Sequence, residues 1–427
     1  MSNQINASAE VKVRGLRWQI PFVLLVSVLI SYFDRMNISY ALPQIAKDYG
    51  WTVKEIGAKG GFLMSMFYVG YGLANIFLSP VGEIFGPRRS LILIVVLFSI
   101  FTALQSLFGL LFTALVTVRV LLGVSEGIHF PMMNMLTKKW FPLHERSRAN
   151  GIWLLGLFLS MILAPFIVVP IIEQWGWRAM FVVLGLSGMV VTLPLLYFFI
   201  YNTPKDHPKM TENEAAYIEA GLEKDEPEET SFWKGARVFL KKKEYWVAML
   251  GGILNNMVAF GLLMWMPTYF TEGRGLAFTD LKYATSIPYV FSIFGVLLWS
   301  YLGDKTNKRA TIAGIGFFGA GFCAYFAATA PTINMVVALF ALTIFIKVTY
   351  ASNEFAIIQR IVPKSHVASG VGLYNGLAMM VGGGLGPAVV GGVVSATGNY
   401  TTGILSLTVL AVAGGIVMFV LGRLIKY

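Results

Sequence analysis

Apolar stretches about as long as a membrane is thick recur along the whole chain of 427 residues. A helix across roughly 30 Å of hydrocarbon needs about 20 mainly apolar residues. The stretches lie near residues 18–42, 57–81, 89–108, 110–136, 148–172, 178–201, 245–269, 281–303, 309–330, 333–358, 367–392 and 401–424. Since a chain in lipid must satisfy its backbone hydrogen bonds internally, they predict an all-α membrane protein of twelve transmembrane helices.

The composition excludes an ordinary soluble domain. Hydrophobic residues make up 56% of the chain and charged residues 13%, whereas soluble domains are about 25% charged. The net charge of +11 does not indicate a nucleic-acid partner, because the basic residues sit in short turns between apolar runs. The single cysteine, Cys323, lies in an apolar segment, so no disulfide framework or metal cluster is expected.

The basic residues of the turns predict the topology. The first apolar run is too long for a signal peptide and contains Asp34, so we interpret it as a retained helix. Thirteen lysines and arginines fall in one set of turns and six in the other. This bias predicts that both termini are cytoplasmic, and we expect the membrane to be the bacterial inner membrane. The predicted parts are a tail (1–17), an N-terminal lobe (18–201), a linker (202–244), a C-terminal lobe (245–424) and a C-terminus (425–427).

The two halves resemble each other at an offset of 221 residues. Residues that match at this offset are Glu83 with Asp304, Arg88 with Arg309, Ser65 with Ser286 and Tyr68 with Tyr289. Repeats of this size build many secondary transporters, whose site lies between the repeats. We therefore expect two pseudo-symmetric six-helix lobes around a central cavity. Glu126 corresponds to Lys347, so these two side chains are expected to face each other across it.

Five charged residues stand at membrane depth: Asp34, Arg35, Arg119, Glu126 and Lys347. Each costs several kcal/mol there unless it faces a wet cavity or a partner, so intramembrane charges indicate a functional site. The alternative is that they form structural ion pairs that fix helices together.

Several motifs resemble the major facilitator superfamily. The turns from Glu83 to Arg89 and from Asp304 to Arg309 carry its acidic and basic signature, although Ser79 and Ile84 replace an expected glycine and arginine. RVLLGVSEGIHFPMMNMLTKKWFPLHERSRANG, with YFDRMNIS, TPKDHPKMTENEAAYI and WMPTYF, is similar to the anion:cation symporter family, which includes bacterial sugar-acid transporters, sialin and vesicular glutamate carriers. The resemblance implies two six-helix lobes that work by alternating access.

The resemblance also implies roles for the buried charges. Asp34 and Glu126 match carboxylates that take part in proton coupling, and Arg35 matches the arginine associated with the substrate carboxylate. Burial favours a protonated carboxyl group and a nearby arginine favours the ionised form, so moving the partner switches proton affinity. Arg119 lies seven residues before Glu126, and is expected either to ion-pair with Asp34 or Glu126 in one state or to act as a static brace.

Two positions depart from the family pattern and leave alternatives open. His129 is either a relay partner of Glu126 or a hydrogen-bonded packing histidine near Pro131, which we favour. Lys347 needs an anion, and Glu126, Glu354 or the substrate would supply it. If it is the substrate, Arg35 and Lys347 together would favour a dicarboxylate or a sulfonated acid.

Weaker candidates are polar residues within apolar helices, which either bind substrate or join helices: Tyr32, Tyr68, Asn255, Asn256, Tyr289, Asn353, Tyr374 and Asn375. Turn residues are predicted to form cytoplasmic ion-pair networks that lock the outward-facing state: Glu83, Arg88, Glu145, Arg146, Arg148, Asp304 and Arg309.

These features predict a secondary active transporter that imports a small organic anion with protons, and we expect it to be a monomer. The anion would be a carboxylate, sugar acid, dicarboxylate or sulfonated acid. The alternatives are an exchanger or facilitator without proton coupling and, with less support, a transport-like membrane sensor. Neither a phosphate-binding loop nor a nucleophile motif is apparent, so ATP-driven transport and an enzyme are disfavoured, and no cofactor or metal is expected.

Overall fold

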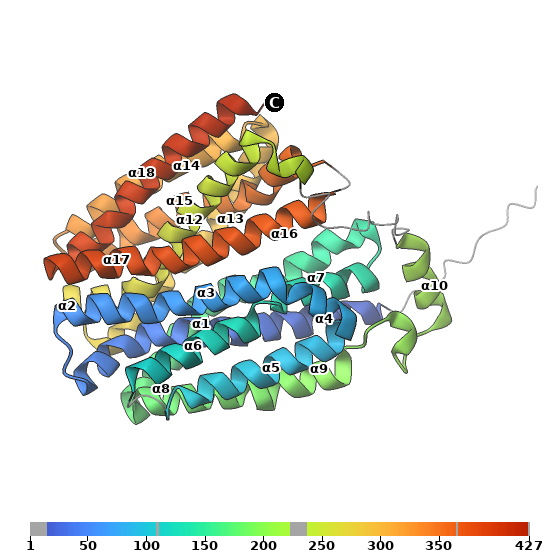
Figure 1. The fold of residues 1–427 in the computed structure, drawn as a ribbon, viewed down its shortest axis with the longest axis horizontal. Coiled ribbons are helices and arrows are strands. Elements are labelled where there is room, and N and C mark those ends of the chain that lie inside the picture. Colours follow the sequence, from blue (N-terminus) through green and yellow to red (C-terminus); the bar gives the residue numbers. More distant parts are fainter. Residues whose placement is uncertain (1–14, 108–110, 223–236, 364–365, 426–427) are drawn as a thin grey trace, which may run out of the picture.

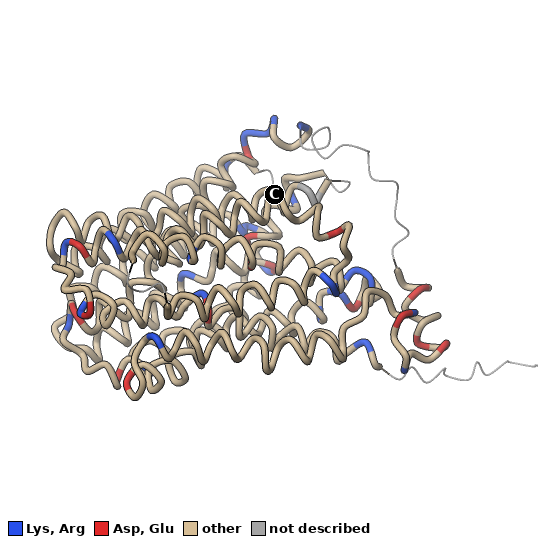
Figure 2. Tube along the Cα trace, turned by 60° about the horizontal axis from the view of Figure 1, so that its bottom comes forward, with Lys and Arg blue, Asp and Glu red and all other residues tan. Residues whose placement is uncertain are grey.

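The computed structural model describes residues 15–107, 111–222, 237–363 and 366–425, and these residues form a bundle of long helices (Figure 1). Most of the predicted tail and parts of the linker and C-terminus lie outside the described residues. Charged residues gather toward the two ends of the bundle, with a few between them (Figure 2). This distribution is the one that a hydrocarbon layer around the middle of the bundle requires.

The N-terminal lobe is formed by the first half of the chain. Its helices are η1 (Leu16–Trp18), α1 (Gln19–Asp48), α2 (Val53–Glu55), the π-helical η2 (Ile56–Gly60), α3 (Gly61–Phe77), α4 (Ser79–Phe85), α5 (Pro87–Leu104), α6 (Phe112–Glu126), α7 (His129–Trp140), α8 (Leu143–Ser187), η4 (Gly188–Thr192) and α9 (Leu193–Phe199). Within the lobe α1 packs against α8, and α3 packs against α6.

The C-terminal lobe repeats the arrangement. Its helices are α12 (Lys243–Thr268), η6 (Tyr269–Gly273), η7 (Phe278–Asp280), α13 (Leu281–Thr306), α14 (Arg309–Thr329), α15 (Ile333–Ile361), α16 (Val367–Leu377), η9 (Ala378–Gly383), α17 (Gly384–Thr397) and α18 (Tyr400–Leu424). Here α13 and α14 pack against α15, and α12 packs against α18.

Within the described ranges, eleven helical segments are long and apolar enough to span a membrane. One of them, Leu143–Phe199, has 57 residues, which is too long for one crossing of roughly 30 Å at about 1.5 Å per residue. Gly176 divides it, because its φ of 80° and ψ of 168° break the helix. Counting both crossings gives the predicted twelve helices, and the expected fold class is confirmed.

The lobes pack tightly at the end of the bundle that carries α2, which we call the sealed end (Figure 1). There η2 and α3 contact α17, and a Cβ atom on Gly57 would lie 2.5 Å from the backbone nitrogen of Ser395. The helices α1, α8 and α13 add two hydrogen bonds between lobes. Tyr40 donates to Thr285 at 3.1 Å, and the hydroxyl of Ser286 donates to the carbonyl of Ile162 at 2.7 Å.

The opposite end, which we call the linker end, carries the described part of the linker, with η5 (Pro204–Asp206) and α10 (Glu212–Gly221) (Figure 1). Buried Glu214 of α10 accepts hydrogen bonds from the Arg17 backbone and side chain, each at 3.1 Å. The ring of His207 packs on Tyr201 at 4.6 Å between ring centres, and burial lowers the pKa of His207. These contacts attach the linker to the N-terminal lobe.

Candidate functional site

A buried ion pair joins α1 to α6 in the middle of the N-terminal lobe. Nη2 of Arg35 donates to Oε2 of Glu126 at 3.0 Å, with 1% and 0% of the side chains exposed. The guanidinium lies 4.2 Å from the ring centre of Tyr32, 4.8 Å from that of Tyr71 and 5.1 Å from that of Phe67. Within the part of the chain that the structure describes, Nε and Nη1 of Arg35 and Oε1 of Glu126 have no hydrogen-bond partner. Arg35 therefore keeps donors that a second anion would satisfy.

The local sequence explains how these side chains meet. Tyr32 and Arg35 are three residues apart in α1 and so share a helix face. Helix α6 ends at Glu126 and α7 begins at His129. Pro131 has no N–H to donate to the carbonyl four residues earlier, which is that of Gly127. Nδ2 of Asn75 donates to this carbonyl at 2.9 Å instead, so the break beside Glu126 is satisfied by α3.

Asp34 lies on a different face of α1 from Arg35, because neighbouring helical residues are about 100° apart. Its side chain is fully buried, and neither carboxylate oxygen has a hydrogen-bond partner among the described residues. The side chain of Thr102 on α5 interacts with this carboxylate outside the geometry of a hydrogen bond, and the charges of Glu126 and Arg119 act on it from α6. Asp34 therefore faces the interior of the N-terminal lobe.

Arg119 contacts the backbone of α1 and no carboxylate. It donates to the carbonyls of Asp34 and Arg35, each at 3.4 Å, and to the side-chain oxygen of Asn37 at 3.3 Å. The expected ion pair of Arg119 with Asp34 or Glu126 is not formed in this conformation. The reason is that Glu126 is taken by Arg35, and the guanidinium of Arg119 lies against the α1 backbone.

The C-terminal lobe holds a second polar cluster around α15. Half-buried Lys347 has no hydrogen bond or ion pair among the described residues, and Glu354 is the carboxylate that acts on its charge. Glu354 accepts a hydrogen bond from Tyr374 at 2.7 Å, and Tyr374 is 2.7 Å from the hydroxyl of Tyr350. Of the three anions considered for Lys347, Glu126 does not pair with it in this conformation, and pairs instead with Arg35 of its own lobe.

The other predicted polar residues divide into two groups. Tyr68 lies at the contact between the lobes, 4.5 Å from the ring of Phe260, and its hydroxyl is buried without a partner. Asn255 and Asn256 contact each other, and Oδ1 of Asn255 has no partner. Tyr289 is buried and Asn375 is half-buried.

By contrast, Asn353 has a structural contact, because it donates to the carbonyls of Thr349 at 2.9 Å and Trp299 at 3.4 Å. His129 also bonds within its lobe, at 2.9 Å to the hydroxyl of Ser27. The break between α6 and α7 separates His129 from Glu126, and no hydrogen bond joins their side chains. This geometry is that of a packing histidine.

The predicted gating residues make contacts within a lobe, with the linker or with the end of the tail. Glu145 pairs with Arg17 at 2.8 Å and accepts from Tyr217 at 3.1 Å. Arg309 pairs with Asp304 at 2.5 Å. Arg88 donates a hydrogen bond to the Tyr197 carbonyl at 2.8 Å, and Arg146 donates one to the Phe141 carbonyl at 3.1 Å. Glu83 lies in α4, and the guanidinium of Arg148 lies near the ring of Trp18.

Sequence reasoning missed three groups of this region. Arg17 and Glu214 form the contact between the tail and the linker. The sequence signal for this contact was an acidic residue in the first turn of the helix that the segment TENEAAYI forms. Thr102 on α5 was also missed, although it is a polar residue inside an apolar stretch.

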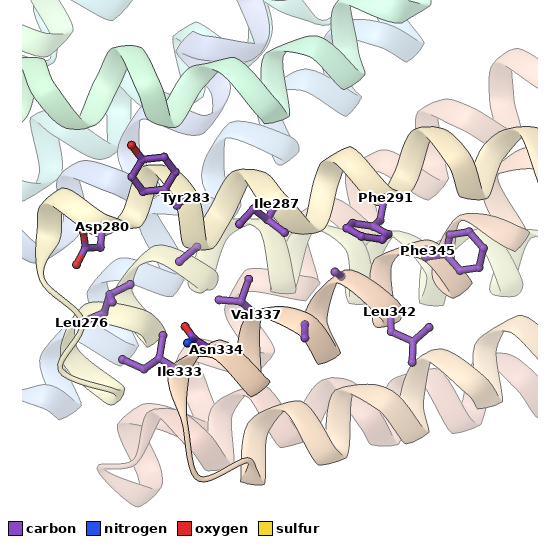
Figure 3. A pocket seen from close by; sticks show the side chains of 13 residues that line it. Leu276, Asp280, Tyr283, Ile287, Phe291, Ile333, Asn334, Val337, Leu342 and Phe345 are labelled. Atoms are coloured by element: carbon purple, nitrogen blue, oxygen red, sulfur yellow. The ribbon is translucent and has the colours of Figure 1, made fainter.

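A groove of about 770 Å³ lies between α13 and α15 (Figure 3). Its walls are mainly apolar, and Tyr283, Ile287, Phe291 and Leu342 are 42–53% exposed on the outer face of the lobe. None of the five membrane-depth charges lines it. The groove therefore suits lipid contact better than the binding of a charged solute.

Comparisons with known proteins agree with this architecture. The family model described as Major Facilitator Superfamily matches residues 24–283 and 274–425. The hexuronate transporter of Bacillus subtilis is 27% identical over 96% of this chain and 93% of its own length. The probable sulfoacetate transporter SauU of Cupriavidus necator is 28% identical over 90% of this chain and 89% of its own length.

Among solved structures, a bacterial homolog of the human lysosomal transporter Spinster superposes with a TM-score of 0.81. It is 18% identical and covers 96% of this chain and 98% of its own, which is a likeness of fold. The family match extends over nearly the whole chain, so the expected resemblance is confirmed and the protein is a transporter rather than an enzyme. The chain belongs to the Major Facilitator Superfamily.

Proposed function

We propose that the protein imports a small organic anion in symport with protons. The observation that carries this proposal is Arg35, which is buried, keeps two guanidinium nitrogens without partners and lies beside a carboxylate that can take up a proton. The relatives named as hexuronate and sulfoacetate transporters support an organic anion as the substrate class.

The anion binds at Arg35. A guanidinium remains charged and offers parallel N–H groups that match a carboxylate or sulfonate. The surrounding rings of Tyr32, Phe67 and Tyr71 exclude water and hold the guanidinium plane. Tyr68, whose hydroxyl has no partner, Asn255, Asn256 and Tyr289 are available for substrate hydroxyl groups at the contact between the lobes.

Proton coupling follows from the Arg35–Glu126 pair. When Glu126 takes up a proton, Arg35 loses its counter-charge and becomes a buried uncompensated cation, which is costly. A substrate carboxylate restores the balance, so proton and anion each favour binding of the other. Asp34 supplies a second proton site in the same lobe, out of direct contact with the anion.

Transport proceeds by alternating access between the two lobes. The tight packing at the sealed end, with its hydrogen bonds Tyr40 to Thr285 and Ser286 to Ile162, supports a conformation closed toward that side. The lysine and arginine bias places the linker end in the cytoplasm. The described conformation is then the inward-facing one. Separation of η2 from α17 at the sealed end gives the outward-facing conformation.

The remaining assignments follow from this orientation. Both termini are cytoplasmic, the membrane is the bacterial inner membrane, and the protein acts as a monomer in lipid. Lys347 is a second substrate cation that contributes when the anion carries two charges, because it has an electrostatic partner in Glu354 but no ion pair among the residues that the structure describes.

The test is uptake of labelled glucuronate and labelled sulfoacetate into proteoliposomes, with and without an inward proton gradient. We expect accumulation only with the gradient. In Asp34→Asn accumulation should disappear while exchange of internal for external substrate persists, and Asp280→Asn, at an exposed position, should resemble the wild type. Exchange without gradient-driven accumulation in the wild type would identify an exchanger and refute proton symport.

A further inference from the structure

Buried polar side chains without partners gather inside the N-terminal lobe, away from the contact between the lobes. On and just after α5 these are Ser99, Thr102 and Gln105, which are 1%, 0% and 0% exposed. Thr192 of η4, also 0% exposed, lies on the neighbouring element. The hydroxyls of the three Ser and Thr residues and both side-chain atoms of Gln105 lack a hydrogen-bond partner in the described chain.

Such a concentration of orphan polar groups indicates internal water. An unsatisfied buried donor or acceptor costs about 1–3 kcal/mol, and native proteins pair the great majority of these groups with protein or ordered water. A buried water needs two to four polar partners, and this region offers them. The residues could have been apolar, as their neighbours in α5 are, if packing alone decided their identity.

The residues on α5 form one stripe. Ser99, Thr102 and Gln105 are spaced by three, so each is a neighbour of the next on the helix surface. The stripe begins beside Gly188, where a Cβ atom would lie 2.1 Å from the hydroxyl of Ser99. Because α5 runs from the linker end to the sealed end, the stripe continues past Thr102 to Gln105 toward the sealed end.

Thr102 connects the stripe to Asp34. Helix α5 packs against α1, and the Thr102 hydroxyl and the Asp34 carboxylate are both buried without a hydrogen-bond partner among the described residues. The electrostatic influence of Thr102 on Asp34 agrees with this placement. The charged groups that face this carboxylate are Glu126 and Arg119, both from α6. Arg35 and the contact between the lobes lie on another face of α1, so Asp34 has polar neighbours that the substrate does not touch.

We propose that Thr102 and Gln105 line a hydrated path inside the N-terminal lobe, along which Asp34 exchanges its proton with the side of the membrane at the sealed end. In each transfer a hydrated proton is passed along water and the Thr102 hydroxyl to a carboxylate oxygen of Asp34. One O–H bond forms at the carboxylate as one breaks at the donor, and the water is left neutral. This inference rests on the proposed symport and gives proton and anion separate routes.

The experiment compares two modes of transport of labelled glucuronate in proteoliposomes. Thr102→Val keeps the side-chain shape and removes the hydroxyl, and Gln105→Met removes the amide. Each should slow gradient-driven uptake by about fivefold, the factor for the roughly 1 kcal/mol of one lost hydrogen bond, and shift its pH profile. Exchange of internal for external glucuronate at equal pH should remain within about twofold, as expected where no interaction is lost.

Controls make each outcome decisive. Thr102→Ser should restore gradient-driven uptake, and Thr117→Val, at an exposed position on α6, should match the wild type. Wild-type uptake by both Thr102→Val and Gln105→Met, or equal loss of uptake and exchange in both, would overturn the path while leaving symport intact. If the wild type itself ignores the gradient, the proposed function fails, and the path fails with it.

Discussion

Replacement of Arg35 by lysine tests whether the shape of the guanidinium, and not only its charge, selects the anion. In the structure one nitrogen of Arg35 holds Glu126 at 3.0 Å, and Nε and Nη1 have no partner. Lysine keeps the positive charge in the same aromatic surroundings but has a single ammonium. It therefore cannot hold Glu126 and present two parallel N–H groups to a carboxylate.

The magnitude follows from the number of bonds lost. A substrate carboxylate that uses both free nitrogens of Arg35 loses one charge-assisted hydrogen bond when lysine is present. Such a bond is worth about 1.5–3 kcal/mol, which corresponds to roughly a 10- to 150-fold loss of affinity. Because the charge remains, the variant should still bind at high substrate concentration.

The assay is the concentration dependence of glucuronate exchange in proteoliposomes, which reports affinity without the proton gradient. Arg35→Lys should raise KM by the stated factor and leave the maximal rate within about threefold of wild type, because uniform binding is what is lost. Arg178→Lys, whose side chain is 46% exposed at the sealed end, is the matched control. An unchanged KM, or a lower maximal rate at unchanged KM, would refute bidentate recognition by Arg35.

Two further predictions concern groups outside this pair. Lys347→Met should raise KM for sulfoacetate about tenfold more than for glucuronate, because only the doubly charged sulfoacetate loses a charge-assisted contact. An equal rise of KM for both substrates would instead assign Lys347 to a structural bridge with Glu354. Glu214→Gln should lower the free energy of unfolding in detergent by roughly 1.5–3 kcal/mol, the value of a hydrogen bond to a charged group, while Glu219→Gln, in an exposed pair, should change it by less than about 1 kcal/mol. Thermal unfolding measures the effect of Glu214→Gln. If this variant has the same free energy of unfolding as the wild type, the linker contact does not stabilise the lobe.

The number of helices could be predicted from the sequence because hydrocarbon thickness limits each crossing directly. The fifth and sixth crossings were also predicted separately, as 148–172 and 178–201, and the structure breaks the helix between them at Gly176. The buried charges could also be located, because their cost in lipid makes each of them conspicuous. The break next to Glu126 was indicated by Pro131, although the partner that satisfies the freed carbonyl, Asn75, belongs to a distant helix.

The pairing of these charges could not be predicted. The repeat predicts only that Glu126 and Lys347 lie at the same depth in the membrane. Ion pairing depends on which cationic side chain lies within reach of the Glu126 carboxylate, and this is Arg35 of α1. The orphan groups on α5 escaped notice for a similar reason. A threonine in an apolar helix usually bonds its own backbone, and only the packed structure reveals that the Thr102 hydroxyl has no partner.

The backbone of α1 gives a physical link between the two adjacent residues that carry the proposed chemistry. Arg119 donates to the carbonyls of both Asp34 and Arg35, while its charge acts on the Asp34 carboxylate. If Asp34 loses its proton, the new anion attracts the guanidinium of Arg119 and competes with those carbonyls for its N–H groups. A movement of Arg119 toward Asp34 would release the α1 backbone at Arg35. Proton loss on one face of the helix would thereby change how the anion is held on the other.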